Sequence, residues 1–369
     1  MSVATLPGRT LVTLALAVLI VAACSPPSAS APSGGSAPSG GASDASTPPS
    51  IGGPGGPDAA PTWAPKRVRL AYVTIASNIL PVWLAKDHGI YEKYNLDVEL
   101  TYIAGAVKIS EALLGGDLDV GATVPASAIG PGLEGADTVM VGSWADKMAF
   151  SLFVQPGIQS VGQLRDKRLS VTRRGSASEI WAGATLKRFG LEPERDYALI
   201  AAGGQPEQLA ALQAGGTDGA IIGPPTNVRA RQLGFHELLS YREYYLETAD
   251  VGLVTTRRFL REQPDVIERL LRASLEAIAL QFQQPELAMA SLARWTQTDD
   301  RELLEETQRF QDSRTNRTMI PSPEGMRVAV DELKDANPKA AAANPSDYFD
   351  LTLIQRLNDS GFVKSLYPQ

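Results

Sequence analysis

Residues 175–179, with the sequence GSASE, have the residue types of a helix N-terminus that can bind an anion. Ser176 followed three residues later by Glu179 forms a capping box, in which both side chains satisfy backbone N–H groups at the helix start. The remaining free N–H groups and the positive end of the helix dipole favour an anion by about 0.3–1 kcal/mol.

Arg173 and Arg174 come directly before the turn, and a guanidinium can pair with a sulfonate, carboxylate or nitrate through two hydrogen bonds. The residues of this turn that we expect to contact a ligand are Arg174, Gly175, Ser176 and Ala177. The alternative is an ordinary N-cap with both arginines in solvent.

The other candidate positions also follow predicted strands. Ser77 and Asn78 lie in the turn after a predicted strand at 68–73 and precede Pro81, which suits the first turn of a helix. Gly105 and Gly204 each follow the second predicted strand of one of two similar α/β blocks. A glycine there would let the backbone approach a ligand closely, although a tight turn explains it equally well. The third strand of the first block ends in Thr123, two residues before Pro125, and that of the second block ends at Gly223, directly before Pro224. These further candidate ligand-binding residues are Ser77, Asn78, Gly105, Thr123, Pro125, Gly204, Gly223 and Pro224.

An internal repeat places these candidates in equivalent positions. The segment ALLGGDLDVGATVP at 112–125 matches ALQAGGTDGAIIGP at 211–224 with an offset of 99 residues. The same offset pairs Leu70 with Leu169 upstream without a gap. Both blocks predict the order strand, helix, strand, helix, strand. Two such α/β units suggest a cleft, because ligands bind outside the carboxyl ends of parallel strands.

Composition narrows the classes of protein. The chain has 369 residues, 44% hydrophobic content and a net charge of −7, which allows two domains with their own cores and disfavours nucleic-acid binding. His88 and His236 occupy dissimilar positions, and Cys24 is the single cysteine, so we expect no catalytic residues, no metal site and no cofactor. Trp83, Trp144 and Trp181 lie near the predicted cleft, where core packing is favoured over stacking on a ligand.

The N-terminus has the pattern of an exported lipoprotein. Arg9 precedes an apolar stretch at 11–22 that is too short for an ordinary membrane span and ends in LIVAAC. This resembles a bacterial lipobox, so residues 1–23 are a predicted signal peptide and Cys24 is the predicted lipidation site. Residues 24–65, rich in Ser, Pro, Gly and Ala, are a predicted disordered tether. We therefore expect an extracytoplasmic protein, held at a bacterial membrane only by its N-terminal lipid.

Four segments resemble a known family: LPVWLAKDHGIYEKYNLDVEL, EALLGGDLDVGAT, GIQSVGQLRDKRLSVTRRGSASE and AALQAGGTDGAIIGPP. They are similar to the nitrate/sulfonate/taurine-type substrate-binding proteins of ABC importers, which include binders of thiamine-precursor pyrimidines. The resemblance spans about residues 67–275. Relatives usually carry at most one basic residue before the Gly-Ser that corresponds to Gly175-Ser176. The Arg173-Arg174 pair departs from this pattern, so the substrate of a relative does not transfer directly to this chain.

The resemblance implies an α/β, two-lobed periplasmic-binding-protein fold of type II, a Venus flytrap with a mixed, mostly parallel sheet flanked by helices in each lobe. Lobe one would comprise residues 66–147 plus 250–369, and lobe two residues 148–249. The implied function is capture of a small, anionic organic solute of sulfonate, nitrate, carboxylate or pyrimidine type. The implied partners are that solute and ABC permease subunits, with the binding protein as a monomer. An enzyme or a ligand sensor built on the same fold is the alternative.

Overall fold

The computed structural model describes residues 63–334 and 336–367. The predicted lipidation site Cys24 and the predicted signal peptide lie outside the described residues, as does nearly all of the predicted tether. Trp63 and Ala64, which the sequence assigns to the tether, are part of the folded chain. The Trp63 ring packs 5.8 Å from that of Tyr94, and the Ala64 carbonyl accepts a hydrogen bond of 2.9 Å from Arg269. The folded part therefore begins before Lys66.

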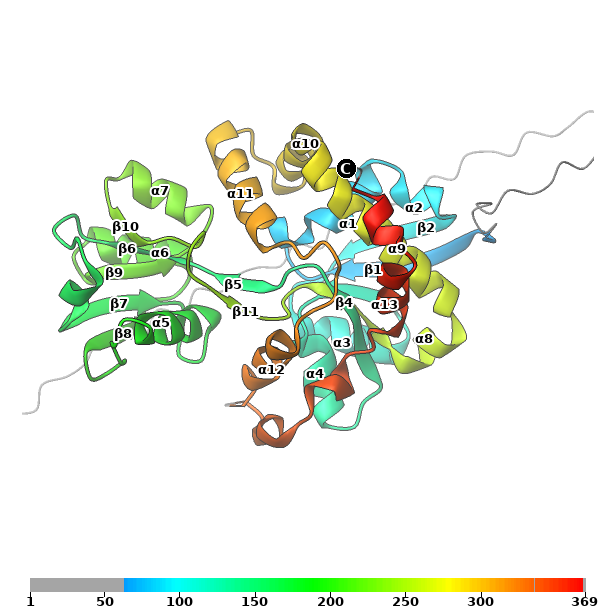
Figure 1. Cartoon of the computed structure of the whole chain (residues 1–369), viewed down its shortest axis with the longest axis horizontal. Helices are drawn as coiled ribbons and strands as arrows, with labels where there is room; N and C mark the ends of the chain where they lie inside the picture. The colour runs from blue at the N-terminus through cyan, green and yellow to red at the C-terminus, as the bar shows by residue number, and fades with distance from the viewer. Residues whose placement is uncertain (1–62, 335, 368–369) are drawn as a thin grey trace, which may run out of the picture. The chain divides into compact units, whose positions relative to one another are not determined.

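The first sheet has the strand order β2-β1-β3-β12-β4. Its strands are β1 (Lys66–Tyr72), β2 (Leu96–Tyr102), β3 (Val120–Thr123), β4 (Thr138–Ser143) and β12 (Gly252–Thr256). Strand β12 runs antiparallel to both of its neighbours, whereas the other four run in one direction. Strand β12 thus brings residues 252–256 back to the first sheet. It also makes this sheet from two distant parts of the chain (Figure 1).

The second sheet has the order β10-β6-β9-β7-β8. Its strands are β6 (Ser151–Val154), β7 (Lys167–Val171), β8 (Tyr197–Ala201), β9 (Gly219–Ile222) and β10 (His236–Leu239). Strand β6 is the one strand of this sheet that runs against the others. Both sheets are therefore mixed but mostly parallel, as expected.

The 99-residue repeat is confirmed at the level of strand register. Leu70 is paired with Leu100 and Val120 in the first sheet, and Leu169 is paired with Leu199 and Gly219 in the second. Each partner in the second sheet lies 99 residues after its counterpart. The offset therefore holds through the third strands, where chance similarity of composition would not preserve it.

Helices cover both faces of each sheet, because alternate strand residues point to opposite faces. The helices of the repeated blocks are η1 (Ser77–Ile79), α1 (Leu80–Asp87), α2 (Ile90–Lys93), α3 (Ala106–Gly115), α4 (Ala126–Leu133), η2 (Val161–Leu164), α5 (Ala177–Lys187), α6 (Gln205–Gln213) and α7 (Thr226–Gln232). In the second sheet, Leu169 packs with Trp181 of α5, whereas Phe153 packs on the other face with Leu212 of α6 and Ala230 of α7. Figure 1 shows this arrangement around the second sheet.

The C-terminal helices complete the first half of the molecule. They are α8 (Arg257–Glu262), α9 (Pro264–Gln283), α10 (Pro285–Thr296), α11 (Arg301–Arg314), α12 (Pro323–Asp331), η3 (Pro338–Ala342), η4 (Pro345–Tyr348), α13 (Thr352–Asp359) and α14 (Phe362–Ser365). Between α12 and α13 the chain forms the two short 3-10 turns η3 and η4, because Asn337 and Asn344 each cap a turn ahead of a proline.

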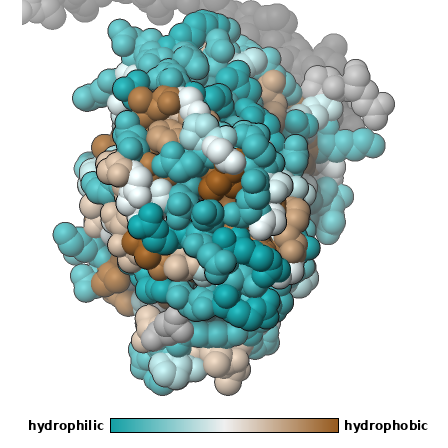
Figure 2. Space-filling model, turned by 90° about the vertical axis from the view of Figure 1, so that its left-hand side faces the viewer, coloured by the Kyte–Doolittle hydropathy of each residue, from teal (hydrophilic) through white to brown (hydrophobic). Residues whose placement is uncertain are grey.

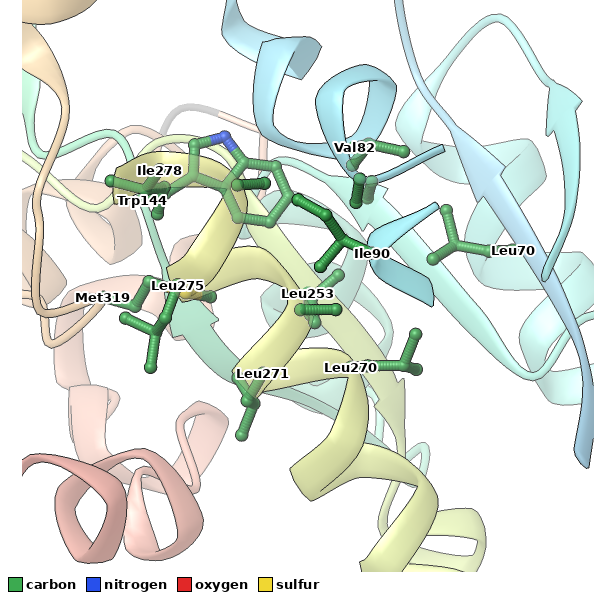
Figure 3. Packing of buried hydrophobic residues seen from close by; sticks show 14 of the residues in the cluster. Leu70, Val82, Ile90, Trp144, Leu253, Leu270, Leu271, Leu275, Ile278 and Met319 are labelled. Carbon is green, nitrogen blue, oxygen red and sulfur yellow. The ribbon is translucent and has the colours of Figure 1, made fainter. Parts of the chain in front are cut away.

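Helix α9 supplies the centre of the largest hydrophobic cluster. Figure 3 shows its apolar side chains lying against residues of the first sheet and of α1. The labelled residues are Leu70, Val82, Ile90, Trp144, Leu253, Leu270, Leu271, Leu275, Ile278 and Met319. Trp83, Trp144 and Trp181 are all fully buried in hydrophobic clusters, so they pack in the core as the sequence favoured.

Two short strands that the sequence pattern did not predict connect the sheets. Strands β5 (Lys147–Ala149) and β11 (Tyr245–Glu247) pair antiparallel as a two-stranded ribbon. The predicted lobe boundaries fall within or beside this ribbon. Three residues are too few to show a strand period in the sequence.

The face formed by the second sheet and its helices is largely hydrophilic, with scattered hydrophobic residues (Figure 2). This is the pattern of a surface in contact with water. Over residues 63–334 and 336–367, no helix combines the length and apolar character needed to span a bilayer.

Candidate functional site

A cavity of about 400 Å³ lies where the connecting segments meet the carboxyl ends of the strands. Residues after β1 and β3 form one wall, and residues after β7, β8 and β9 form another. Both connecting segments and helices α11 and α12 close the remaining sides. The lining is Ala76, Ser77, Asn78, Val124, Pro125, Ala126, Met148, Ala149, Phe150, Ala177, Gln205, Gly223, Pro224, Thr248, Ala249, Asp250, Phe310, Arg314, Ala329 and Glu332.

The repeat makes this cavity pseudo-symmetric. Asn78 and Ala177, Val124 and Gly223, and Pro125 and Pro224 are pairs of lining residues separated by 99 positions. Equivalent positions after β1 and β7, and after β3 and β9, thus face one cavity. This is the arrangement expected when ligands bind outside the carboxyl ends of strands in α/β sheets.

Three helices of at least eight residues begin at lining residues. Helix α4 starts at Ala126, α5 at Ala177 and α6 at Gln205. The first turn of a helix presents backbone N–H groups and the positive end of the helix dipole. The two walls formed by the strand ends are therefore suited to an electronegative group, without a positively charged side chain.

Helix α11, the end of α12 and the second connecting segment carry the charged groups of the lining. Arg314 of α11 pairs with Asp250 of the second connecting segment. Their side chains are only 12% and 25% exposed, so the pair is partly withdrawn from water. Glu332, at the end of α12, makes no side-chain hydrogen bond or ion pair with the residues that the structure describes. This part of the lining therefore contains two carboxylates, those of Asp250 and Glu332, and one guanidinium, that of Arg314.

Burial and the neighbouring Asp250 raise the pKa of Glu332 to about 7. The Glu332 side chain is nevertheless exposed to solvent where it lines the cavity, so its desolvation is only partial. An ionised carboxylate is disfavoured there both by desolvation and by the second negative charge.

Asn78 also leaves hydrogen-bonding capacity unmet beside the cavity. Its backbone carbonyl accepts a bond of 2.7 Å from Trp144 Nε1, which holds the turn against the core. Its side-chain Oδ1 is buried and has no protein partner among the described residues. An unpaired buried polar atom costs about 1–3 kcal/mol.

The structure brings six of the twelve predicted ligand-binding residues to the cavity lining, namely Ser77, Asn78, Pro125, Ala177, Gly223 and Pro224. It places the other six outside the lining, namely Gly105, Thr123, Arg174, Gly175, Ser176 and Gly204. Contact with a solute stays a prediction for all twelve.

Arg174 is held by acidic neighbours. Its guanidinium donates to Glu179 at 2.9 Å and to Glu194 at 2.6 Å. These carboxylates raise the pKa of the Arg174 guanidinium by hydrogen bonding. The positive charge that the sequence assigned to the cleft is therefore largely compensated on the surface.

The capping box at the start of α5 is present in altered form. Ser176 Oγ accepts from the Glu179 backbone N–H at 3.5 Å, as expected. The Glu179 carboxylate, however, accepts from the Gly175 N–H at 2.6 Å, one residue before the cap. Ser176 is buried, and its hydroxyl is also 3.0 Å from that of Ser178. Ser176 therefore shapes the turn while Ala177 reaches the cavity.

The remaining predicted residues have local roles. Thr123 is fully buried, with its hydroxyl 2.8 Å from that of Ser127 at the start of α4. Gly105 has a φ of 101°, which favours glycine before α3. A Cβ on Gly204 would lie 2.6 Å from the Glu207 carboxylate, so glycine gives that side chain room.

The charged residues of the cavity, Asp250, Arg314 and Glu332, were not predicted as ligand contacts. Arg314 and Glu332 come from α11 and α12, whose sequences read as ordinary amphipathic helices. Asp250 was expected only as the residue at which the chain returns to lobe one. The segment that returns from the second sheet contains more acidic than basic residues. This is the one sequence signal that could have pointed to the charged part of the lining.

Two mixed sheets with a cavity at their strand ends define a periplasmic-binding-protein fold. Residues 76–288 match the family model described as NMT1/THI5 like. This match covers more than half of the chain, which therefore belongs to that family. A sequence comparison with curated proteins found no match.

Solved structures share the fold at low sequence identity. The periplasmic aliphatic sulphonate binding protein SsuA from Escherichia coli is 21% identical, with a TM-score of 0.59 over 77% of this chain and 92% of that one. A putative periplasmic sulfonate-binding protein from Methylobacillus flagellatus is 16% identical, with a TM-score of 0.65 over 82% and 97%. The nitrate-binding protein NrtA from Synechocystis is 14% identical, with a TM-score of 0.54 over 82% and 91%.

Proposed function

We propose that this chain is an extracytoplasmic solute-binding lipoprotein of an ABC importer. It captures a small organic solute with an anionic or strongly electronegative group, of sulfonate, nitrate, carboxylate or pyrimidine type, and delivers it to permease subunits. The observation that carries this proposal is the cavity where equivalent turns of the two repeats meet. The printed descriptions of the sulfonate- and nitrate-binding proteins that share the fold agree with it.

The electronegative group would bind at the starts of α5 and α6, because the Ser127 and Ala128 N–H groups of α4 already donate to the carbonyls of Val124 and Pro125. Backbone N–H groups in these first turns donate hydrogen bonds in fixed directions. Apolar residues such as Val124, Ala149 and Phe310 would contact the carbon skeleton. A cavity of about 400 Å³ is at the small end of ligand pockets, which favours a solute of modest size.

Closure of the two lobes would accompany binding. We assign lobe one to residues 66–147 plus 250–369 and lobe two to residues 148–249. The hinge would be the ribbon of β5 and β11 with its flanking residues, at 145–150 and 250–252. A few backbone dihedral changes there would suffice. The mature protein would be a monomer, attached to the membrane through a lipid on Cys24.

A thermal-shift screen tests solute binding. Sulfonates, nitrate, carboxylates and pyrimidines are each added to the protein, and a true solute at 100 times its Kd adds about 2.7 kcal/mol of stability. Ala177→Phe would fill the cavity and abolish the shift, while Ala184→Phe on the same helix, outside the cavity lining, would keep it. A shift that survives Ala177→Phe would place binding elsewhere. Solute-stimulated ATP hydrolysis by a reconstituted permease then tests delivery.

A further inference from the structure

One side-chain amide of the cavity lining is held in a single orientation. The Oε1 atom of Gln205 accepts a hydrogen bond of 2.7 Å from the backbone N–H of Gly223, and both residues line the cavity. A backbone N–H can only donate, so the atom that faces it must be the amide oxygen. The Nε2 group of Gln205 is therefore the other arm of the amide. It makes no hydrogen bond with any residue that the structure describes.

The position of Gln205 places this second arm beside other donors. Gln205 is the first residue of α6, so the helix leaves its backbone N–H without an internal partner. Pro206 comes next and has no N–H, so the first turn of α6 lacks one donor that the Gln205 side chain can replace. Ala177, the first residue of α5, contributes a further unpaired N–H to the same lining.

The donor belongs to only one of the two repeats. The residues 99 positions earlier are Ala106 for Gln205 and Val124 for Gly223. Ala106 has no side-chain donor, and its carbonyl accepts from Ser127 Oγ at 3.2 Å, which ties the start of α3 to α4. The cavity is therefore pseudo-symmetric in its backbone but not in its polar side chains.

We propose that Gln205 is a specificity-determining residue that binds an oxyanion group of the solute through Nε2. This inference rests on the proposed function and deepens it. The hydrogen bond from Gly223 sets the orientation of the amide before any solute arrives, so the donor is preorganised. A solute oxygen accepts from Gln205 Nε2 and from the unpaired N–H groups at the starts of α5 and α6. A solute that presents an N–H or O–H at this point meets another donor and is rejected.

An isosteric replacement tests this role, because it keeps the bond from Gly223 and removes the donor. In Gln205→Glu, one carboxylate oxygen still accepts from the Gly223 N–H, while the other replaces Nε2. Calorimetry on the full-length protein at pH 8 uses propane-1-sulfonate and nitrate as probes. We expect the variant to bind about 10-fold to 100-fold more weakly than the parent, as for a lost hydrogen bond to a charged group. Gln213→Glu adds the same charge at the exposed end of α6 and should bind as the parent does.

A pH series separates the loss of a donor from a loss of structure. Both probes stay ionised as the pH falls, whereas the introduced carboxyl gains a proton near about pH 4.3 and becomes an O–H donor. The affinity of Gln205→Glu should therefore return toward that of the parent in acid. The ratio of variant to parent affinity is compared, because both proteins share Glu207 of the same turn and Asp250, Arg314 and Glu332 of the lining.

The outcomes separate the two proposals. Unchanged affinity in Gln205→Glu, or a loss that is the same at every pH, overturns the role of Gln205 and leaves solute binding intact. A pyrimidine that binds the parent when neither anion does overturns it as well. If neither these probes nor any solute of the wider screen binds, the proposed function fails, and the role of Gln205 fails with it.

Discussion

The guanidinium of Arg314 pairs with the carboxylate of Asp250 where the chain returns from the second sheet to the first. The same end of α11 also holds the outgoing segment, because the Arg314 carbonyl accepts from the Asp146 N–H at 3.1 Å. Lys147 adds a bond of 2.9 Å to the Ser313 carbonyl. One helix end therefore ties both connecting segments together beside the cavity.

Replacing Arg314 should destabilise this junction. Arg314→Ala leaves Asp250 partly buried without its partner, and we expect the free energy of unfolding to fall by about 1–3 kcal/mol. Urea denaturation measures the loss. Arg301→Ala on the same helix is the control, since that side chain is 68% exposed and its pairs should contribute less than about 1 kcal/mol. Equal losses in both variants would contradict the assignment.

The repeat could be predicted from the sequence because its matches fall where chemistry restricts the residue. Asp119 and Asp218 each accept a bond of 2.8 Å from the backbone N–H of Arg69 or Arg168, and these pairs again lie 99 residues apart. A side chain that bonds the neighbouring strand fixes strand register locally. The offset therefore showed the positions of β1, β3, β7 and β9.

Half of the candidate site could not be predicted, because it depends on tertiary contacts. Glu332 and Arg314 reach the cavity only through the packing of α11 and α12, which no local pattern specifies. Arg174 was assigned to the ligand because it precedes a helix N-terminus. Its actual partners include Glu194, twenty residues away, and that contact requires the folded second sheet.

Glu306 connects α11 to the half of the molecule that contains the second sheet. Its carboxylate is 2% exposed and accepts from Asn227 at 3.1 Å and Arg242 at 2.8 Å. Glu306→Gln removes charge from a buried group that arginines surround. We expect a loss of about 1–3 kcal/mol in thermal or chemical denaturation.

The matched control for this contact is Glu302→Gln. Glu302 lies one turn earlier on α11 and accepts from Gln232 at 3.1 Å in an exposed setting. Its replacement should change stability by less than about 0.5 kcal/mol. Small-angle scattering of Glu306→Gln should also show a larger radius of gyration than the parent, because a contact between the two halves is weakened. An unchanged radius and stability would show that the contact is dispensable.

Gly252 permits the close approach of β12 to β4. A Cβ at this position would lie 1.9 Å from the Gly142 carbonyl oxygen and 2.7 Å from Ser143 Cα, both of which are backbone atoms. Gly252→Ala must therefore displace a strand, and we expect a loss of more than about 3 kcal/mol or failure to fold. Gly162→Ala, where a Cβ would meet nothing within 4 Å, should fold with parental stability. Soluble yield and melting temperature compare the two.

Cys24 should be the first residue of the mature protein and carry a diacylglyceryl group. The sequence LIVAAC places the single cysteine at the position that lipoprotein processing requires. Mass spectrometry of protein purified from bacterial membranes should detect the modified residue, and Cys24→Ser should release the protein from the membrane fraction. Cleavage at another position would reject the lipoprotein assignment.

The pH dependence of stability tests the environment of Glu332 without any solute. Its pKa is raised in the folded protein to about 7, whereas an unperturbed glutamate titrates near 4.5. Between these values the folded state binds more protons than the unfolded state, so stability contributed by this residue falls as the pH rises. Glu332→Gln cannot ionise and avoids this loss.

The Glu332→Gln variant should therefore match the parent at pH 4 and melt at a higher temperature at pH 8, with the difference developing between pH 4.5 and pH 7. Glu324→Gln should show no such divergence. A variant that is less stable than the parent at pH 8 would mean that the ionised Glu332 has a stabilising partner, and the cavity wall would then be electrically balanced before any solute arrives.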